Sequence, residues 1–139
     1  MRVIIGGAHN GKRKYVKGKL EKDSSKNLHF YEGVLPEKRS FSKNDKIIIG
    51  NFEDIFLSLN QLEEERLVSN IVDTLKKIDQ NAEVICICTD IGRGIVPLQK
   101  EDRKLRDACG RLYQKLFLES DCVIRIWYGI PEVLKGEEW

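Results

Sequence analysis

Hydrophobic residues in this chain gather in five short runs, and the stretches between them carry polar residues at most positions. Short apolar runs that are rich in β-branched residues predict strands. The predicted strands cover residues 2–5, 28–31, 46–49, 83–88 and 122–127. The run at 83–88 is apolar at nearly every position, which is typical of a strand that is covered on both faces of a parallel sheet.

Between these runs, apolar residues recur at spacings of three and four, which predicts amphipathic helices. We expect helices over residues 11–21, 53–79 and 99–118. Residues 32–45 have the composition of an exposed connection. The residues after the last predicted strand are expected to form only a short tail.

The alternation of strands and helices predicts one three-layer α/β domain over residues 1–139, with a mainly parallel sheet. The net charge of +2 is too small to indicate nucleic acid as a partner. No apolar run approaches the roughly 20 residues that span a bilayer. Four cysteines lie in apolar or helical runs without a C-x-x-C pair, which indicates reduced core thiols and a cytoplasmic location: Cys86, Cys88, Cys109 and Cys122.

A glycine-rich segment directly follows the first predicted strand and precedes the first predicted helix. Its sequence, Gly-Gly-Ala-His-Asn-Gly-Lys, fits the G-x-x-x-x-G-K pattern of a P-loop. Such a loop points backbone N–H groups at phosphate oxygens, and its lysine reaches the β- and γ-phosphates. The alternative is a glycine turn that only connects strand and helix. The candidate phosphate-binding residues are Gly6, Gly7, Ala8, His9, Asn10, Gly11, Lys12 and Arg13.

Arg13 stands where a P-loop normally has the Ser or Thr that binds Mg²⁺. A guanidinium cannot coordinate a metal ion, although it could hold a phosphate oxygen directly. P-loop enzymes usually place a second magnesium ligand, an acid, at the end of another strand, but here Gly50 ends the strand. Either Glu53 or Asp54 reaches back to the metal, or both lie in the first turn of the next helix, where the helix dipole favours acids. We expect ATP or GTP to bind, and the role of Mg²⁺ stays open.

Two further segments carry candidate chemistry. Residues 89–97 would end a strand in Asp90 and a glycine-containing loop, and residues 106–114 belong to the last predicted helix. Asp107 and Arg111 are four residues apart and could form a helix ion pair. Three polar residues of this helix could contact a ligand, although they cannot all share one helix face: Arg106, Arg111 and Gln114.

Together the three segments resemble the adenosylcobinamide kinase / adenosylcobinamide-phosphate guanylyltransferase family of cobalamin biosynthesis. The family patterns G-G-A-R-S-G-K-S, E-V-G-M-G-I-V-P and R-D-x-A-G-R-x-N-Q correspond to GGAHNGKR, DIGRGIVP and RDACGRLYQ in this chain. The resemblance extends over residues 1–13 and 84–130. It implies a P-loop NTPase-like fold, ATP or GTP as cofactor, a corrinoid substrate and assembly into a homotrimer.

The resemblance also implies roles for individual residues. Lys12 and Asp90 correspond to catalytic positions, with Asp90 standing where the family has Glu. Further nucleotide contacts are implied on the second loop and the last helix, at Gly92, Arg93, Gly94, Arg111 and Gln114.

Several departures from the family pattern bear on catalysis. Arg13 replaces the serine after the loop lysine, Gly50 replaces an acid, and Tyr113 replaces an asparagine. The chain is also shorter between its second and third predicted strands, where the family carries the histidine that accepts GMP. Of the two histidines, His9 lies in the loop, and His29 lies in an apolar run where a packed, hydrogen-bonded histidine is expected.

The sequence therefore predicts a nucleotide-binding protein that lacks guanylyltransferase activity. Retention of the kinase activity is one hypothesis. A non-catalytic nucleotide-binding or regulatory role is the alternative. An unrelated P-loop kinase is a third hypothesis, and the two C-terminal segments count against it.

Overall fold

The computed structural model describes residues 1–22, 27–37, 40–59, 63–90 and 99–139. Within these ranges one sheet has the strand order β2-β3-β4-β1-β5-β6. Its parallel strands are β1 (Arg2–Gly6), β2 (Asn27–Glu32), β3 (Asp45–Gly50), β4 (Glu83–Thr89) and β5 (Cys122–Trp127), and β6 (Ile130–Lys135) runs antiparallel to β5. The helices are α1 (Lys12–Leu20), α2 (Phe52–Ser58), α3 (Glu64–Asp79) and α4 (Lys100–Glu119).

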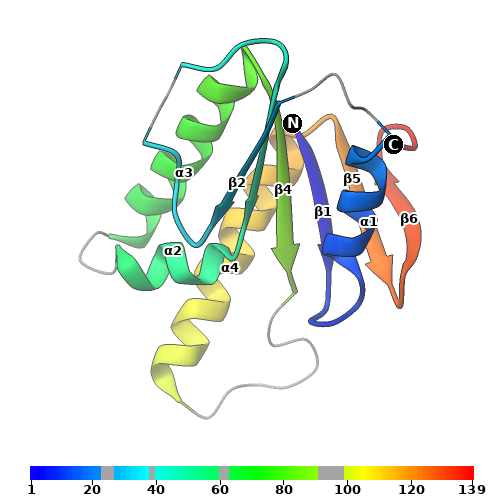
Figure 1. The fold of residues 1–139 in the computed structure, drawn as a ribbon. Coiled ribbons are helices and arrows are strands. Elements are labelled where there is room, and N and C mark those ends of the chain that lie inside the picture. The colour runs from blue at the N-terminus through cyan, green and yellow to red at the C-terminus, as the bar shows by residue number, and fades with distance from the viewer. Residues whose placement is uncertain (23–26, 38–39, 60–62, 91–98) are drawn as a thin grey trace.

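Helices cover both faces of the sheet, as Figure 1 shows. Helix α1 packs Val16 and Leu20 against one face, whereas α2, α3 and α4 enclose the larger core on the other. Successive strand residues point to opposite faces, so Ile48 packs with α1 while Ile47 and Ile49 join the larger core. This arrangement confirms the predicted three-layer α/β fold with a mainly parallel, P-loop NTPase-like sheet.

The prediction of one continuous helical segment over residues 53–79 is wrong in one respect. The structure has two separate helices there, α2 and α3. Helix α2 ends at Ser58, whose hydroxyl donates to the carbonyl oxygen of Ile55 at 3.1 Å. Helix α3 begins after Glu63, which has an extended backbone conformation. Each helix buries its own apolar stripe, so the spacing of apolar residues did not reveal the break.

The prediction that only a short tail follows β5 is also wrong, because residues Ile130–Lys135 form strand β6. Tyr128 and Gly129 both have positive φ angles, 47° and 79°, and primed two-residue hairpin turns require positive φ at both central positions. Pro131 is tolerated because β6 is an edge strand. Every residue of β6 is exposed, so the strand lacks the alternation of buried and exposed positions that would have predicted it.

The predicted exposed connection is only partly exposed. Phe41 is buried in the larger core, and its ring meets the His29 ring edge to face with centroids 5.3 Å apart. The expectation that the four cysteines are core thiols is confirmed, because all four are buried and free. Burial raises the pKa of Cys86 and of Cys109 to about 12. Among the described helices, none is long and apolar enough to cross a membrane.

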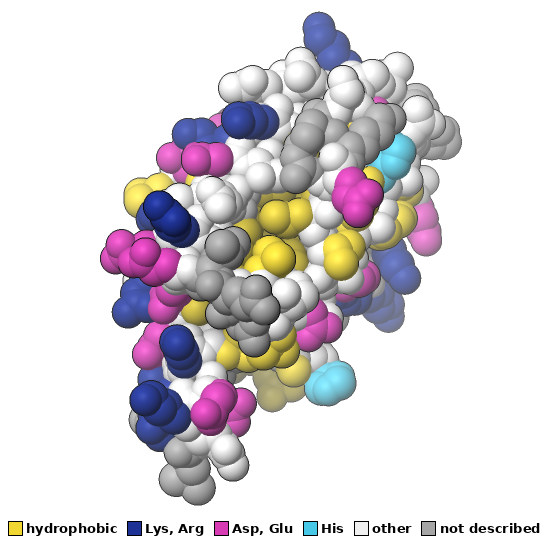
Figure 2. Space-filling view, turned by 90° about the vertical axis from the view of Figure 1, so that its left-hand side faces the viewer, with side chains coloured by type: hydrophobic (Ala, Val, Ile, Leu, Met, Phe, Trp, Pro, Cys, Tyr) yellow, Lys and Arg dark blue, Asp and Glu magenta, His cyan; other side chains and the backbone are white. Residues whose placement is uncertain are grey.

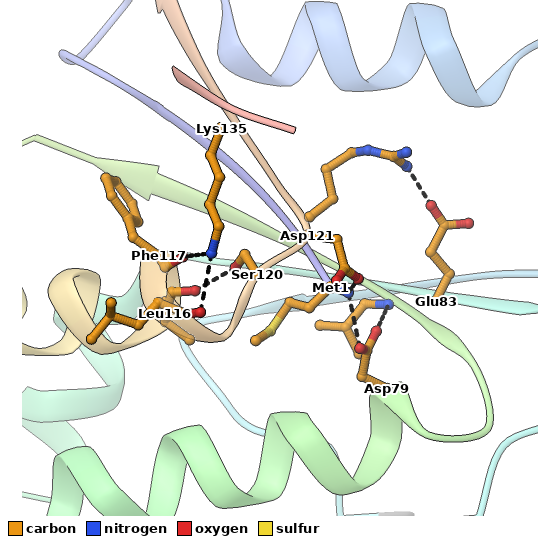
Figure 3. Close-up of polar contacts among 11 residues, drawn as sticks. Met1, Asp79, Glu83, Leu116, Phe117, Ser120, Asp121 and Lys135 are labelled. Atoms are coloured by element: carbon orange, nitrogen blue, oxygen red, sulfur yellow. Dashed lines mark hydrogen bonds and ion pairs between the residues drawn. The ribbon is translucent and has the colours of Figure 1, made fainter. Parts of the chain in front are cut away.

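Polar contacts fix the end of the sheet where β1 begins (Figure 3). The amino group of Met1 lies 2.9 Å from Asp79 Oδ2 and 3.2 Å from Asp121 Oδ2. Burial alone would lower the pKa of this amino group, but the two carboxylates raise it. Lys135 of β6 donates to the carbonyl oxygens of Phe117 and Leu118 at 2.8 and 3.1 Å, which ties the hairpin to the end of α4.

A hydrogen-bonded carboxylate at the start of β3 gives the fold a predictable acid sensitivity. Asp45 Oδ2 accepts from the backbone N–H of Ser42 at 2.8 Å, and Oδ1 lies 3.1 Å from His29 Nε2. These contacts lower the pKa of Asp45 from 3.8 to about 2. The ionised carboxylate therefore contributes stability that is complete above the ordinary pKa and is lost as the pH falls toward the folded-state pKa.

We expect Asp45→Asn to lower the melting temperature at neutral pH. The deficit should shrink as the pH falls from about 4 to about 2, because the native carboxyl is then protonated as well. Calorimetric melts across this range provide the measurement. Asp73→Asn, at an exposed position of α3, is the matched control and should track the wild type. A deficit that does not change with pH would show that the charge of Asp45 has no role.

Candidate functional site

The glycine-rich loop connects β1 to α1 at the carboxyl ends of the parallel strands. A Cβ on Gly6 would lie 2.5 Å from the carbonyl oxygen of Ile126, so this close approach of two backbones requires glycine. Gly11 precedes the first turn of α1 with φ of 88°. The carbonyl oxygen of Asn10 accepts from the N–H of Gly129 at 2.8 Å. The β5–β6 turn therefore braces the loop.

Lys12 is held inside the loop. Its side chain is buried, and Nζ donates to the carbonyl oxygen of Gly7 at 2.8 Å. Burial, and after it the positive charge of Arg13, lower the pKa of Lys12, and the charge of Glu53 opposes both effects. Two cationic side chains thus lie close together at the start of a helix, where the helix dipole also favours an anion.

Arg13 forms a two-point ion pair with Glu32, the last residue of β2. Nη1 donates to Oε1, and Nη2 donates to Oε2 at 2.8 Å. Both side chains remain about half exposed, at 47% and 49%. A Cβ on Gly50 would lie 2.8 Å from Arg13 Nη2, so the guanidinium packs directly over the Cα atom of Gly50.

The residues at the usual magnesium position do not fit Mg²⁺. A P-loop Ser or Thr hydroxyl and a strand-end carboxylate normally hold this ion. Here Arg13 replaces the hydroxyl, Gly50 replaces the acid, and the guanidinium occupies the space above Gly50. Across the described ranges, no group of three or more His, Cys, Asp or Glu residues could hold a metal ion.

The two acids that follow Gly50 both lie in the first turn of α2, as one of the two interpretations predicted. Asp54 Oδ2 accepts from Asn51 Nδ2 at 2.8 Å. Glu53 differs, because its buried Oε1 has no hydrogen-bond partner among the described residues. Its negative charge acts on Lys12 and Cys88. Glu53 therefore also lies near Lys12 of the loop.

Asp90 follows β4 beside the loop, and its N–H donates to the carbonyl oxygen of Gly6 at 2.9 Å. It lines a pocket of about 380 Å³ together with residues of α4. Three residues of this helix that the sequence singled out, of which we expected only some to face a ligand, all line this one pocket: Arg106, Arg111 and Gln114. The predicted contacts at Gly92, Arg93 and Gly94 lie outside the described residues.

The ion pairs around this pocket differ from the helix pair that the sequence allowed. Arg111 pairs with Glu64 of α3, and Arg106 Nη2 lies 3.3 Å from Asp107 Oδ1. Tyr113, which stands at the family's asparagine position, donates its hydroxyl to the carbonyl oxygen of Thr89 at 3.0 Å. Sequence spacing could not reveal the Arg111–Glu64 pair, because it joins two helices that are distant in the sequence.

A second pocket, of about 560 Å³, lies between α2, α3 and α4. Phe56, Leu67 and Leu105 contribute to it, as do Glu63 and Lys104. Figure 2 views the molecule from the left-hand side of Figure 1 and shows hydrophobic side chains near the middle of that face, with charged side chains around them. No residue of the glycine-rich loop lines this pocket, so we do not include it in the candidate site.

Fold and sequence pattern together define a P-loop NTPase-like α/β protein. Residues 43–134 match the family model described as cobinamide kinase / cobinamide phosphate guanyltransferase. This is more than half of the chain, and the chain therefore belongs to that family of nucleotide-using transferases of cobalamin biosynthesis. A search of curated proteins finds no match.

The matched residues confirm the resemblance and delimit what it covers. They include Gly50, Asp90 and the residues of α4. The glycine-rich loop and Arg13 lie before the match begins. Their assignment therefore rests on the sequence pattern and on the geometry described above.

Proposed function

We propose that the protein binds the phosphates of ATP or GTP at the loop from Gly6 to Arg13. The observation that carries this proposal is the position of Lys12, whose buried ammonium group lies across the loop on the carbonyl oxygen of Gly7. A buried cation without a carboxylate bonded to it is costly unless an anion binds beside it. The start of α1 supplies backbone N–H donors for that anion.

We further propose that any remaining transferase activity is the kinase half of the family's chemistry. A hydroxyl oxygen of cobinamide would attack the γ-phosphorus, and the bond to the bridging oxygen would break to release ADP or GDP. Lys12 would stabilise the charge on the transferred group. Asp90 would accept the hydroxyl proton or orient the hydroxyl, and its place beside Gly6 supports this role.

We propose that the protein lacks the guanylyltransferase activity of the family. The sequence has two histidines, and neither combines an activating partner with a place beside the loop. His29 is hydrogen-bonded to Asp45 and packed on Phe41. It lies three residues before Glu32 on β2, which places it about 10 Å from the strand end that faces the site. His9 is exposed in a left-handed backbone conformation, and no described contact would activate it.

Incubation with α-labelled GTP tests this absence directly. We expect no label on the protein after denaturation, because no histidine is placed to form a phosphoramidate bond. A known guanylyltransferase of the family serves as the positive control. Covalent GMP on the wild type that is lost in His9→Ala or His29→Ala would contradict the proposal and identify the nucleophile.

A non-catalytic nucleotide-binding protein is the second candidate function. The ion pair between Arg13 and Glu32 over Gly50 favours it, since the usual magnesium position is filled and phosphoryl transfer normally depends on that ion. Steady release of ADP or GDP that requires adenosylcobinamide would establish the kinase. Nucleotide binding without such release would establish the second candidate.

The corrinoid substrate, the cytoplasmic location and the homotrimer stay predictions. Exposed apolar side chains on the edge hairpin, among them Tyr128 at 77% and Ile130 at 67%, support self-association through that edge. Sedimentation velocity measures the assembly state.

A further inference from the structure

The departures at Arg13 and Gly50 are structurally linked. A side chain at position 50 would begin where the guanidinium lies, because its Cβ would be 2.8 Å from Nη2 and 3.1 Å from Nη1. A side chain at position 50 would therefore have to displace the guanidinium from the place where it lies. The serine-to-arginine and acid-to-glycine departures therefore lie in contact with each other, at the place where a P-loop protein holds its metal ion.

Glu32 fixes this replacement in position. It ends β2 in register with Gly50 of β3, so its carboxylate reaches the guanidinium from the neighbouring strand. The pair engages two of the five N–H donors of a guanidinium and leaves three that it does not use. Because both side chains are about half exposed, a ligand can approach them from solvent.

The guanidinium of Arg13 can interact with the oxygens of a bound polyphosphate. An arginine is charged at every physiological pH, is planar, and suits phosphate oxygens. Held near Lys12, the guanidinium offers its remaining N–H donors to phosphate oxygens, while Glu32 balances its charge. A magnesium ion at the same place would be repelled by the guanidinium and would lack both of its usual protein ligands.

We propose that the loop binds nucleotide triphosphate without Mg²⁺, and that the guanidinium of Arg13, held by Glu32 above Gly50, takes the position of the metal ion. This inference rests on the proposed nucleotide binding. The site would then bind ATP or GTP in the metal-free form.

Calorimetric titration of GTP in excess MgCl₂ and in excess EDTA tests the proposal. For the wild type we expect dissociation constants within about threefold of each other in the two buffers. Arg13→Ser should weaken binding in EDTA by about 10- to 100-fold, the usual worth of a charged hydrogen bond. Lys14→Ser, at the next and exposed position of α1, is the matched control and should change affinity by less than about threefold.

A double variant tests the same idea by restoring the usual ligands. Arg13→Ser combined with Gly50→Asp should bind GTP more tightly with Mg²⁺ than with EDTA, by about tenfold or more. With Mn²⁺ as a probe, electron paramagnetic resonance should detect protein-bound metal in the double variant with GTP and not in the wild type. Thermal melts establish that each variant is folded, and Arg13→Ser alone carries the test if the double variant is not.

The outcomes distinguish the proposed nucleotide binding from the proposed metal-free mode of binding. A wild type that binds GTP at least about tenfold more weakly in EDTA would overturn the metal-free site and leave nucleotide binding intact. If Glu53→Gln abolished that dependence, the buried carboxylate of Glu53 would be the metal ligand instead. Absence of GTP binding in both buffers would overturn the proposed function and this inference together.

Discussion

Replacing Lys12 with alanine is expected to weaken the binding of ATP and GTP by about 100-fold, the upper range for a hydrogen bond to a charged group. The ammonium group is buried and lies on the carbonyl oxygen of Gly7. Removing it takes away the only cation within the turn of the loop itself, because Arg13 points toward Glu32 at its rim. Isothermal titration calorimetry measures the affinity.

The matched control for Lys12 is Lys14, two residues further along α1 and exposed. Lys14→Ala removes the same charge from the same helix, and we expect less than about a threefold change in affinity. Thermal melts should show that both variants are folded. Equal affinity in Lys12→Ala and the wild type would mean that the nucleotide binds elsewhere, and the pocket beside Arg106 and Arg111 would become the candidate.

Replacing Phe52 with alanine should destabilise the fold by about 3–5 kcal/mol, the usual cost of removing a fully buried aromatic side chain. Phe52 is 0% exposed and begins α2 immediately after β3. Its ring belongs to the core between the sheet and the helices α2, α3 and α4. The variant leaves a cavity that the surrounding side chains cannot fill.

Chemical denaturation followed by circular dichroism measures this loss. Leu57→Ala in the same helix is the control, since Leu57 is 57% exposed and should cost no more than about 0.5 kcal/mol. A Phe52→Ala variant as stable as Leu57→Ala would contradict the placement of α2 against the sheet. It would also undermine the positions of Gly50, two residues before Phe52, and of Glu53, directly after it.

Most of the fold follows from local patterns in the sequence. The apolar runs at 46–49 and 83–88 form central strands that are buried on both faces, as their near-continuous apolarity predicts. The glycine-rich loop also follows from pattern, because its spacing and its place between strand and helix are local features. His29 occupies an edge strand and is hydrogen-bonded, as its apolar neighbours predicted.

The features that the sequence did not reveal depend on contacts between distant residues or on weak patterns. Strand β6 is exposed along its whole length, and so its residues show no periodicity. Glu32 was not predicted as the partner of Arg13. Its position could have been derived from the register of β2 and β3, which aligns it with Gly50, but that register requires knowing that the two strands are parallel neighbours. The pair of Arg111 with Glu64 depends on how α3 and α4 pack.

In our proposal, the contact between Arg13 and Gly50 takes the place of the metal ligands of a P-loop. In P-loop proteins the serine and the acid act on one ion. The glycine then makes room for the guanidinium, and Glu32 holds it. If the site binds nucleotide in this way, we expect its rate of phosphoryl transfer to be low, because that step normally depends on the metal ion.

A crystal structure of the protein with GTP and MgCl₂ would show whether the guanidinium of Arg13 stands in place of the metal ion. We expect the β- and γ-phosphates to lie in the loop between Gly6 and Lys12, a guanidinium nitrogen of Arg13 to contact a phosphate oxygen, and no metal ion to lie above Gly50. Phosphates bound outside the loop, or a magnesium ion in the place of the guanidinium, would contradict this expectation.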